Sequence, residues 1–328
     1  MADERPLVSI ITANHNGAEF LAAAARSVLS QSLTAFEWII ADDASTDDSL
    51  AVIAAACAGD PRVRVMPATV NGGPAVARNR ALAAARGAWL AVFDSDDLME
   101  PDRLERLLAE ARSSGADIVV DNVRVFSATD PTGQPLLTGQ AYASPRWVSL
   151  ADYIASSRMY APRPGLGYLK PMFNSEKLGP LRYRENLKIG EDYDLVLNLM
   201  ARGARLRLTP PALYGYRKHG ASISAVMRAD HLVQMMAADA EFEAGLEAHP
   251  PQVRRAQQRR RRSLETALAY DTIICALKRR DLRAGFVLSL RQPRAWPLLT
   301  LPVRVRFQRL WARLSTACRA LGMKPLSR

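Results

Sequence analysis

Three carboxylates stand within four positions of the sequence, directly after six apolar residues. The apolar run is Ala88–Phe93, and the acids are Asp94, Asp96 and Asp97. Like charges this close raise one another's pKa unless a positive group lies between them. Carboxylate oxygens in such a cluster are suitable ligands for Mg²⁺ or Mn²⁺. The pattern therefore indicates a divalent-cation site at the end of a buried strand, and a solvated turn before the next helix is the alternative.

Other polar residues also follow predicted strands. Asp43 could accept a hydrogen bond from a base N–H or a ribose hydroxyl, or it could stabilise a turn. His15 has a flat ring that could stack on a base, although a lone loop histidine more often has no such role. The turn "NGGPAVARNR" starts a helix and makes Arg78 and Arg80 available to phosphate. It lacks the spacing of a dinucleotide-binding loop or a P-loop, so neither site is indicated.

A third acidic group comes much later in the chain. Glu191, Asp192 and Asp194 begin a predicted helix, where carboxylates are favoured by the helix dipole. A carboxylate that faces the nucleotide site from this position could instead act as a general base. The residues alone do not separate these two interpretations. His219, in the loop "YRKHGASIS", is a candidate metal ligand or phosphate contact.

Alternating strand and helix patterns must position these residues. Strands are predicted over 6–13, 36–43, 62–68, 88–94 and 116–126, and helices over 18–31, 47–59, 74–87 and 101–115. Pro74 and Pro101 suit first helical positions, and glycines follow several helix ends. This alternation predicts an α/β fold with a Rossmann-like, doubly wound, mostly parallel sheet. Ligands bind such sheets at the carboxyl ends of the strands, where the polar residues gather.

The second half of the chain has a less regular pattern. Residues 127–165 are rich in turn residues and are expected to form a loop or insertion with one short helix, 149–158. Further strands are predicted over 167–173 and 204–217, with a helix over 190–203 between them.

The net charge of +11 is concentrated in the last third of the chain. Residues 1–225 hold 24 Lys and Arg against 25 Asp and Glu, whereas residues 226–328 hold 20 against 8. We therefore predict a basic helical extension over 226–328. Its arginines and the aromatic residues Trp296, Phe307 and Trp311 favour contact of 254–328 with an anionic membrane surface. A solvated extension and a homodimer contact are the alternatives, and no motif supports nucleic-acid binding.

The composition also bears on location. The three cysteines are widely spaced and fit a reducing cytoplasm better than a disulfide framework. The N-terminus lacks the pattern of a signal peptide, and no apolar run reaches the roughly 18 residues of a membrane-spanning helix. We expect a cytoplasmic protein, associated peripherally with the inner face of the plasma membrane.

The motifs, taken in order, resemble those of family 2 glycosyltransferases of the GT-A fold. The matching segments are "VSIITANHNG", "FEWIIADDASTDDS", "NGGPAVARNRAL", "GAWLAVFDSDD", "GEDYDLVLNLMARG" and "YRKHGASIS", which span about residues 6–224. The likeness is strongest to bacterial exopolysaccharide glycosyltransferases of the succinoglycan type. It implies a catalytic domain over 1–225, with a nucleotide-binding half (1–126) and an acceptor half (127–225).

The resemblance also implies roles for single residues. His15 falls where the family usually has a tyrosine that packs on the base, and Asp43 where an acid reads the uracil edge. Asp94, Ser95 and Asp96 form the D-x-D stretch that meets ribose and metal. The remaining matches are Asp97 as an adjacent metal ligand, Asp192 as the catalytic base, Arg78 at the diphosphate and His219 near the metal. His15 and the pair Ala13-Asn14 depart from the family pattern, which leaves the base contacts open.

The implied activity is inverting transfer of a sugar, expected to be a hexose, from a UDP-sugar with Mn²⁺ or Mg²⁺ as cofactor. The implied acceptor is a hydroxyl of a glycan or of a polyprenyl-diphosphate-linked oligosaccharide. A non-catalytic scaffold for polysaccharide assembly at the membrane is the alternative. If the cation arrives with its nucleotide, the carboxylates of Asp94, Asp96 and Asp97 should be poorly neutralised in the protein alone.

Overall fold

The computed structural model describes residues 5–220 and 227–300, and chain contacts divide the protein into two compact units. The first unit runs to Arg261 and the second begins at Arg262, within the long helix α9 (Pro251–Lys278). The boundary lies beyond the charge break at 225/226. The reason is that the start of α9 packs into the first unit, where Arg260 donates hydrogen bonds to Asp239 and to the Ser157 carbonyl.

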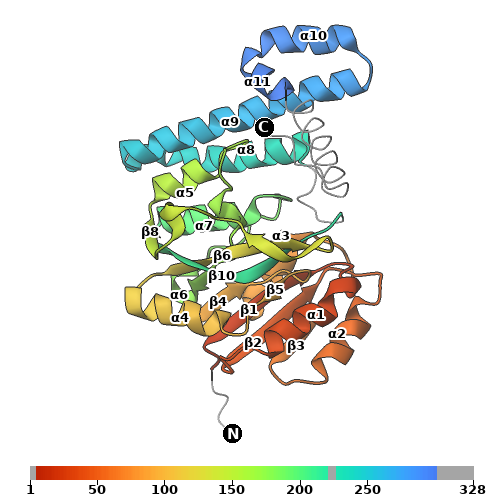
Figure 1. Ribbon diagram of the computed structural model, residues 1–328, viewed down its shortest axis with the longest axis vertical. Helices are drawn as coiled ribbons and strands as arrows, with labels where there is room; N and C mark the ends of the chain where they lie inside the picture. Colours follow the sequence, from red (N-terminus) through yellow and green to blue (C-terminus); the bar gives the residue numbers. More distant parts are fainter. Residues whose placement is uncertain (1–4, 221–226, 301–328) are drawn as a thin grey trace, which may run out of the picture. The chain divides into compact units, whose positions relative to one another are not determined.

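The first half of unit one alternates strands and helices as predicted (Figure 1). Its elements are β1 (Val8–Asn14), α1 (Ala18–Leu29), β2 (Phe36–Asp42), α2 (Ser49–Cys57), β3 (Val63–Pro67), α3 (Pro74–Ala84), β4 (Trp89–Val92), β5 (Leu98–Met99), α4 (Arg103–Ser114) and β6 (Ile118–Ser127). Pro74 occupies the first turn of α3, and Gly115 ends α4 with a φ of 68°. A left-handed residue at this position favours glycine, which has no Cβ to clash.

One sheet organises this unit, with strand order β3-β2-β1-β4-β9-β6-β10-β5. Strands β1, β2, β3 and β4 pair in parallel, as do β6 and β10 (Leu206–Lys218). The short strand β9 (Met172–Asn174) lies antiparallel between β4 and β6. The mostly parallel central sheet is therefore confirmed, with β9 inserted in the opposite direction and β5 paired antiparallel with β10 at the edge.

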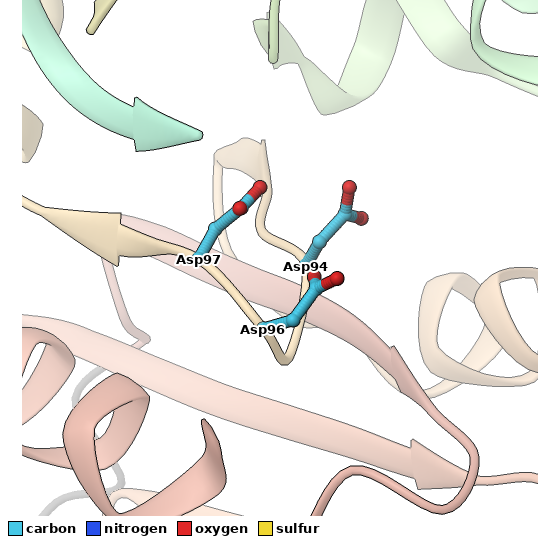
Figure 2. A group of neighbouring side chains, drawn as sticks. All are labelled: Asp94, Asp96 and Asp97. Atoms are coloured by element: carbon cyan, nitrogen blue, oxygen red, sulfur yellow. The ribbon is translucent and has the colours of Figure 1, made fainter. Parts of the chain in front are cut away.

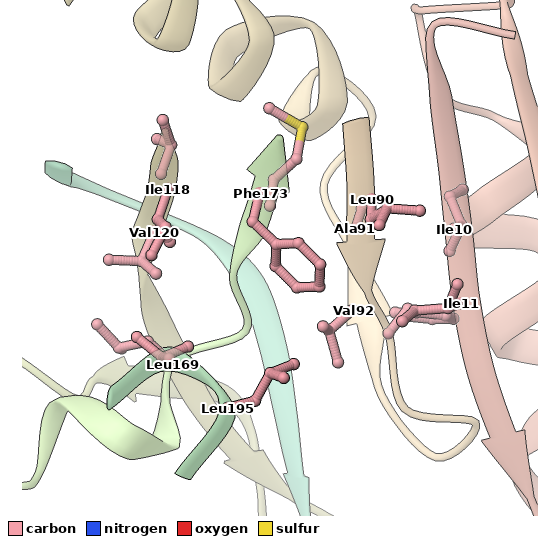
Figure 3. Packing of buried hydrophobic residues seen from close by; sticks show 14 of the residues in the cluster. Ile10, Ile11, Leu90, Ala91, Val92, Ile118, Val120, Leu169, Phe173 and Leu195 are labelled. Carbon is pink, nitrogen blue, oxygen red and sulfur yellow. The ribbon is translucent and has the colours of Figure 1, made fainter. Parts of the chain in front are cut away.

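The hydrophobic core includes side chains from most strands of the sheet, and one part of it packs around β9. Phe173 lies between residues of β4 and β6, and Leu169 and Leu195 close the same cluster (Figure 3). All three side chains are at most 2% exposed. The apolar strand interiors thus fix the positions at which the polar residues emerge at the strand ends.

The later segments depart from their predicted bounds in two places. The predicted strand 167–173 is strand only over Met172–Asn174, and a 3₁₀ turn (Leu166–Tyr168) precedes it. Pro171 explains part of this, because proline has no N–H for a strand ladder. The strand β10 continues through Pro210 and Pro211 only with a register shift against β6 between Thr209 and Ala212.

The region 127–165 contains more regular structure than predicted. Strand β7 (Asp130–Pro135) pairs antiparallel with β6, and β8 (Arg146–Val148) pairs antiparallel with β10. The short predicted helix is α5 (Leu150–Ser156), capped by the Ser149 hydroxyl. It is followed by α6 (Ser175–Leu178), α7 (Glu191–Ala201) and α8 (Ala229–Ala244). The β7 sequence "DPTGQP" has turn composition, so pairing with β6 overrides its local preference.

The described part of unit two is helical. After α9 it contains α10 (Leu282–Arg291), a 3₁₀ turn (Pro293–Ala295) and α11 (Trp296–Leu299). Among the described residues, none of the helices has both the length and the apolar character required to cross a bilayer. Phe307 and Trp311, which contributed to the membrane prediction, lie outside the described residues.

Candidate active site

The ends of β1 and β2 are joined by buried polar residues. Asn14 and Asp42 are register partners, and the Asn14 amide donates to Asp42 Oδ1 over 2.8 Å. Asp42 also accepts hydrogen bonds from the backbone and hydroxyl of Ser45. Asp42 therefore stabilises the turn after β2.

Asp43 holds the turn that precedes α3. Its carboxylate accepts hydrogen bonds from the backbone N–H groups of Gly72 (2.9 Å) and Gly73 (2.7 Å). The Nδ1 atom of His15, an exposed residue, lies 2.8 Å from the Asp43 carbonyl oxygen. The structure thus gives Asp43 a positioning role and brings His15 beside it, while nucleotide contact by either residue stays a prediction.

The three acids that follow β4 converge in space. Asp94, Asp96 and Asp97 come from the short segment between β4 and β5 (Figure 2). Ser95 separates Asp94 from Asp96 in the sequence. One carboxylate oxygen from each of the three acids lies within 4.8 Å of the others. Hard oxygen donors at this separation are chemically suited to Mg²⁺ or Mn²⁺.

Asp97 is the most deeply buried member of this cluster, at 1% exposed. Its carboxylate accepts hydrogen bonds from the Tyr214 hydroxyl and from the Arg217 backbone N–H, each over 2.7 Å. Both donors are uncharged. Burial, reinforced by the negative charges of Asp96 and Asp94, raises the pKa of Asp97 well above its usual range. A carboxylate buried in this way fits a position that a cation would neutralise.

His219 joins the cluster through Asp96. Its Nε2 atom lies 2.7 Å from Asp96 Oδ2, and its ring packs against Phe20 with 4.6 Å between ring centroids. The guanidinium of Arg217 donates to the Asp96 carbonyl oxygen. The end of β10 therefore supplies the groups that position Asp96, and ligation of a metal by His219 stays a prediction.

Asp94 belongs to a buried ion network rather than to an uncompensated cluster. Arg78 donates to Asp94 Oδ1 over 2.6 Å, and the Lys170 ammonium lies 2.7 Å from Asp94 Oδ2. Burial alone would raise the pKa of Asp94, but these two cations outweigh it and hold the pKa below its usual range. The expectation that all three carboxylates are poorly neutralised is therefore wrong for Asp94, because cations from two distant segments fold against it.

The same cations reach the acids of α7. Lys170 donates to Asp192 Oδ2 over 2.8 Å, and Arg78 donates to Glu191 Oε1 over 2.6 Å. Asp192 Oδ1 lies 3.6 Å from Arg78 and is buried without a hydrogen-bond donor among the described residues. One oxygen of Asp192 is thus anchored by Lys170, whereas the other is ion-paired with Arg78 but accepts no hydrogen bond from the described residues.

The structure separates the three acids at the start of α7. Asp192 faces the Lys170 and Arg78 network, whereas Asp194 points to Arg184, with 3.4 Å between carboxylate and guanidinium. Gly190 precedes the helix with a φ of 90° and has no side chain to cap it. The acids therefore still suit the helix dipole, and only Glu191 and Asp192 also share the network with Asp94.

Sequence reasoning missed Lys170 and Tyr214, which connect the site. A charged residue within a predicted apolar strand was the available signal for Lys170. Arg80, expected near phosphate, instead donates to the carbonyl oxygens of Asp42 and Met66. Arg78 binds carboxylates through Nη1 and Nη2, and its buried Nε has no hydrogen-bond acceptor among the described residues, so its contact with phosphate stays a prediction.

Comparison with known proteins identifies the family. The sequence profile of "Glycosyl transferase family 2" matches residues 9–160. The succinoglycan biosynthesis protein ExoO of Rhizobium meliloti (strain 1021) is 36% identical over 95% of this chain and 89% of its own length. This chain belongs to glycosyltransferase family 2. It is accordingly a transferase enzyme, and the predicted family is confirmed.

Another relative and two solved structures show which fold the chain adopts. The teichuronic acid biosynthesis glycosyltransferase TuaG of Bacillus subtilis (strain 168), itself a tentative assignment, is 30% identical over 69% of this chain and 84% of its own length. The structure of S. aureus TarS with UDP-GlcNAc aligns with a TM-score of 0.61, covers 87% and 92% of the two chains, and shares 18% identity. A Pyrobaculum calidifontis mannosyltransferase, solved with GDP-Man and Mn²⁺, aligns with a TM-score of 0.57 over 89% and 83% of the chains at 18% identity. These structures confirm the predicted GT-A-type fold.

Proposed function

We propose that this enzyme is a metal-dependent, inverting glycosyltransferase that transfers a hexose from a UDP-sugar to a hydroxyl group. The proposed acceptor is a glycan or a polyprenyl-diphosphate-linked oligosaccharide in bacterial exopolysaccharide or cell-surface polysaccharide synthesis. The relatives in succinoglycan biosynthesis and the TarS complex with UDP-GlcNAc support the pathway class and the donor class. The contacts of the Asp192 carboxylate are the main support for the proposed reaction mechanism.

The contacts of Asp192 support its assignment as the general base. Lys170 anchors Oδ2, and the buried Oδ1 atom has no hydrogen-bond donor among the residues described. An acceptor hydroxyl that donates to Oδ1 would satisfy this atom and lose its proton to it. The deprotonated oxygen then attacks the anomeric carbon from the face opposite the nucleotide, and the bond to the diphosphate breaks. A single displacement inverts the anomeric configuration and forms no sugar–enzyme bond.

We assign binding of the UDP-sugar donor to residues at the ends of the strands. Asp43 and His15 would contact the base, and Asp94 with Ser95 would contact the ribose. Because Asp94 is held by Lys170 and Arg78, it is oriented before the donor binds. We also assign Arg78 to the diphosphate. Its positive charge would there partly neutralise the negative charge that develops on the leaving group.

Asp96 and Asp97 are the residues best placed to hold Mn²⁺ or Mg²⁺, with His219 adjacent to Asp96. Neither aspartate is paired with Lys170 or Arg78, in contrast to Asp94. A bound ion would supply positive charge to the leaving diphosphate. The Mn²⁺ complex of the Pyrobaculum mannosyltransferase supports this class of cofactor.

Substitution of Asp192 by Asn tests whether Asp192 is the general base. Asn keeps the shape but cannot accept the proton, so sugar transfer should fall by about 10²- to 10⁴-fold. Binding of UDP and Mn²⁺, measured by calorimetry, should remain. UDP release from a panel of UDP-sugars with the cell-envelope glycan fraction as acceptor gives the rate.

Asp194→Asn is the matched control, because Asp194 lies on the same helix and pairs with Arg184 outside the network. It should retain transfer. Retained turnover in Asp192→Asn would refute the assigned base. Absence of UDP release by the unmodified enzyme with every donor, together with intact UDP binding, would favour the alternative of a non-catalytic assembly scaffold.

We also propose that the enzyme works at the inner face of the plasma membrane and contacts anionic lipid through 254–328. The excess of arginine over acids in this region supports the proposal. A polyprenyl-linked acceptor would be presented at the same surface. A homodimer contact through these helices is the competing interpretation, and nucleic acid is not a proposed partner.

A further inference from the structure

The net positive charge of the chain belongs entirely to its second compact unit. Residues 1–261 hold 30 Lys and Arg against 30 Asp and Glu, whereas residues 262–328 hold 14 against 3. The boundary found from chain contacts therefore separates a neutral catalytic unit from a strongly basic one. An excess of this size attracts anionic surfaces over several ångströms at physiological salt.

Within this unit, α10 packs closely against the end of α9 by one side. Gly285 is buried, and a Cβ atom placed on it would lie 2.7 Å from Cδ2 of Leu277. A larger residue at this position would require the Leu277 side chain to move. The side of α10 that carries Gly285 therefore packs against the end of α9.

Three apolar residues of α10 are exposed beside this contact. Leu282, Phe286 and Leu290 recur every four residues, so they lie along one side of the helix. Their exposed fractions are 70%, 64% and 56%. We call these three residues the α10 stripe. Trp296 is also half exposed, and its indole N–H donates to the Ser289 carbonyl, which fixes the ring beside the end of α10.

Exposed arginines border the α10 stripe. Arg283 and Arg291 lie on α10, and Arg279, Arg280 and Arg294 lie just before and after it. Three apolar side chains on a ten-residue helix cover far less than the roughly 800 Å² per partner of a stable protein interface. Arginine beside an apolar stripe and a tryptophan is instead the composition of a helix that lies in a lipid headgroup layer.

We propose that the α10 stripe is the face that inserts into an anionic bilayer, with the flanking arginines bound to lipid phosphates. This inference rests on the proposed membrane association and narrows it from 254–328 to one helix face. It gives the apolar and the charged residues separate roles. The stripe supplies insertion, and the basic unit supplies the preference for anionic lipid.

Vesicle flotation of the full-length protein tests the proposal. The protein should float with vesicles of phosphatidylcholine and phosphatidylglycerol, and much less with phosphatidylcholine alone. Phe286→Ser combined with Leu290→Ser should lower the partition coefficient by about tenfold or more, since two apolar side chains lose their burial in lipid. Val233→Ser is the control, because Val233 is an exposed apolar residue of α8 in unit one, and it should bind as the unmodified protein does.

Several outcomes would overturn the proposal. They are equal binding to neutral and anionic vesicles, unchanged binding by the double variant, and absence of vesicle binding in the unmodified protein. If light scattering shows a dimer that the double variant converts to monomer, the stripe joins two copies of the chain instead. UDP release without vesicles is measured on the same samples, so failure of the catalytic proposal is seen separately from failure of membrane insertion.

Discussion

Replacement of Lys170 by Met should remove the cation that holds both Asp192, the proposed base, and Asp94, the proposed ribose contact. The Lys170 side chain is 9% exposed and binds Asp94 and Asp192 over 2.7 and 2.8 Å. Met has a similar length but no charge, so it removes the anchor of Asp192 without opening a large cavity. A hydrogen bond between charged groups contributes about 1.5–3 kcal/mol, which corresponds to a roughly 10- to 150-fold decrease in kcat.

The same change should also lower stability. Loss of one partner of a buried ion pair costs about 3–5 kcal/mol, because the remaining charge stays buried. Here Asp94 and Asp192 would keep only the nearby Arg78. Lys170→Arg retains the charge and should recover part of both losses, although its planar head group cannot reproduce the ammonium geometry.

The assay is UDP release with Mn²⁺ over a range of donor concentrations, together with thermal unfolding of each variant. We expect kcat to fall because Asp192 loses its anchor, and the donor KM to rise because Asp94 loses one of its two cations. Lys177→Met is the control, since Lys177 is 58% exposed and lies 3.7 Å from Asp117. A folded Lys170→Met enzyme with normal kcat would refute the positioning role. So would a decrease in rate that matches the fraction of unfolded protein.

Three further changes test the supporting structure. Tyr214→Phe removes the hydroxyl that donates to Asp97, so it should destabilise the fold by about 1–3 kcal/mol in chemical denaturation and weaken Mn²⁺ binding in calorimetry. Gly87→Ala places a Cβ atom 2.4 Å from the Ser9 backbone nitrogen, so it should cost about 1–3 kcal/mol, and an unchanged Tm would refute this close approach. Burial raises the pKa of Asp239, so the native state binds more protons than the unfolded chain and loses stability as pH rises through that pKa. Asp239→Asn should remove this part of the pH dependence of the denaturation midpoint, and an identical pH dependence in both proteins would count against it.

Local sequence patterns predicted the first half of the sheet and the edge that carries the site. Apolar runs end at Asp42 and at Asp94, and parallel strands bring such ends together whatever the details of packing. Asp94, Asp96 and Asp97 lie together for a simpler reason, because all three belong to one short segment between β4 and β5. The strand β9 could not be read in this way, because three residues after a proline carry too little periodicity to indicate a direction or a partner.

The sequence by itself determined the family, the order of the elements and the acids that could do chemistry, because each of these depends on short-range pattern and spacing. Only the tertiary structure decided how those acids are charged and held. Lys170 reaches Asp94 and Asp192 because β9 inserts next to β4, and Arg78 reaches Glu191 across 113 positions of sequence. Electrostatic partners depend on distance in space, and burial strengthens their effect on one another. The three neighbouring carboxylates therefore differ: Asp94 is neutralised by protein cations, whereas Asp97 is buried among uncharged donors.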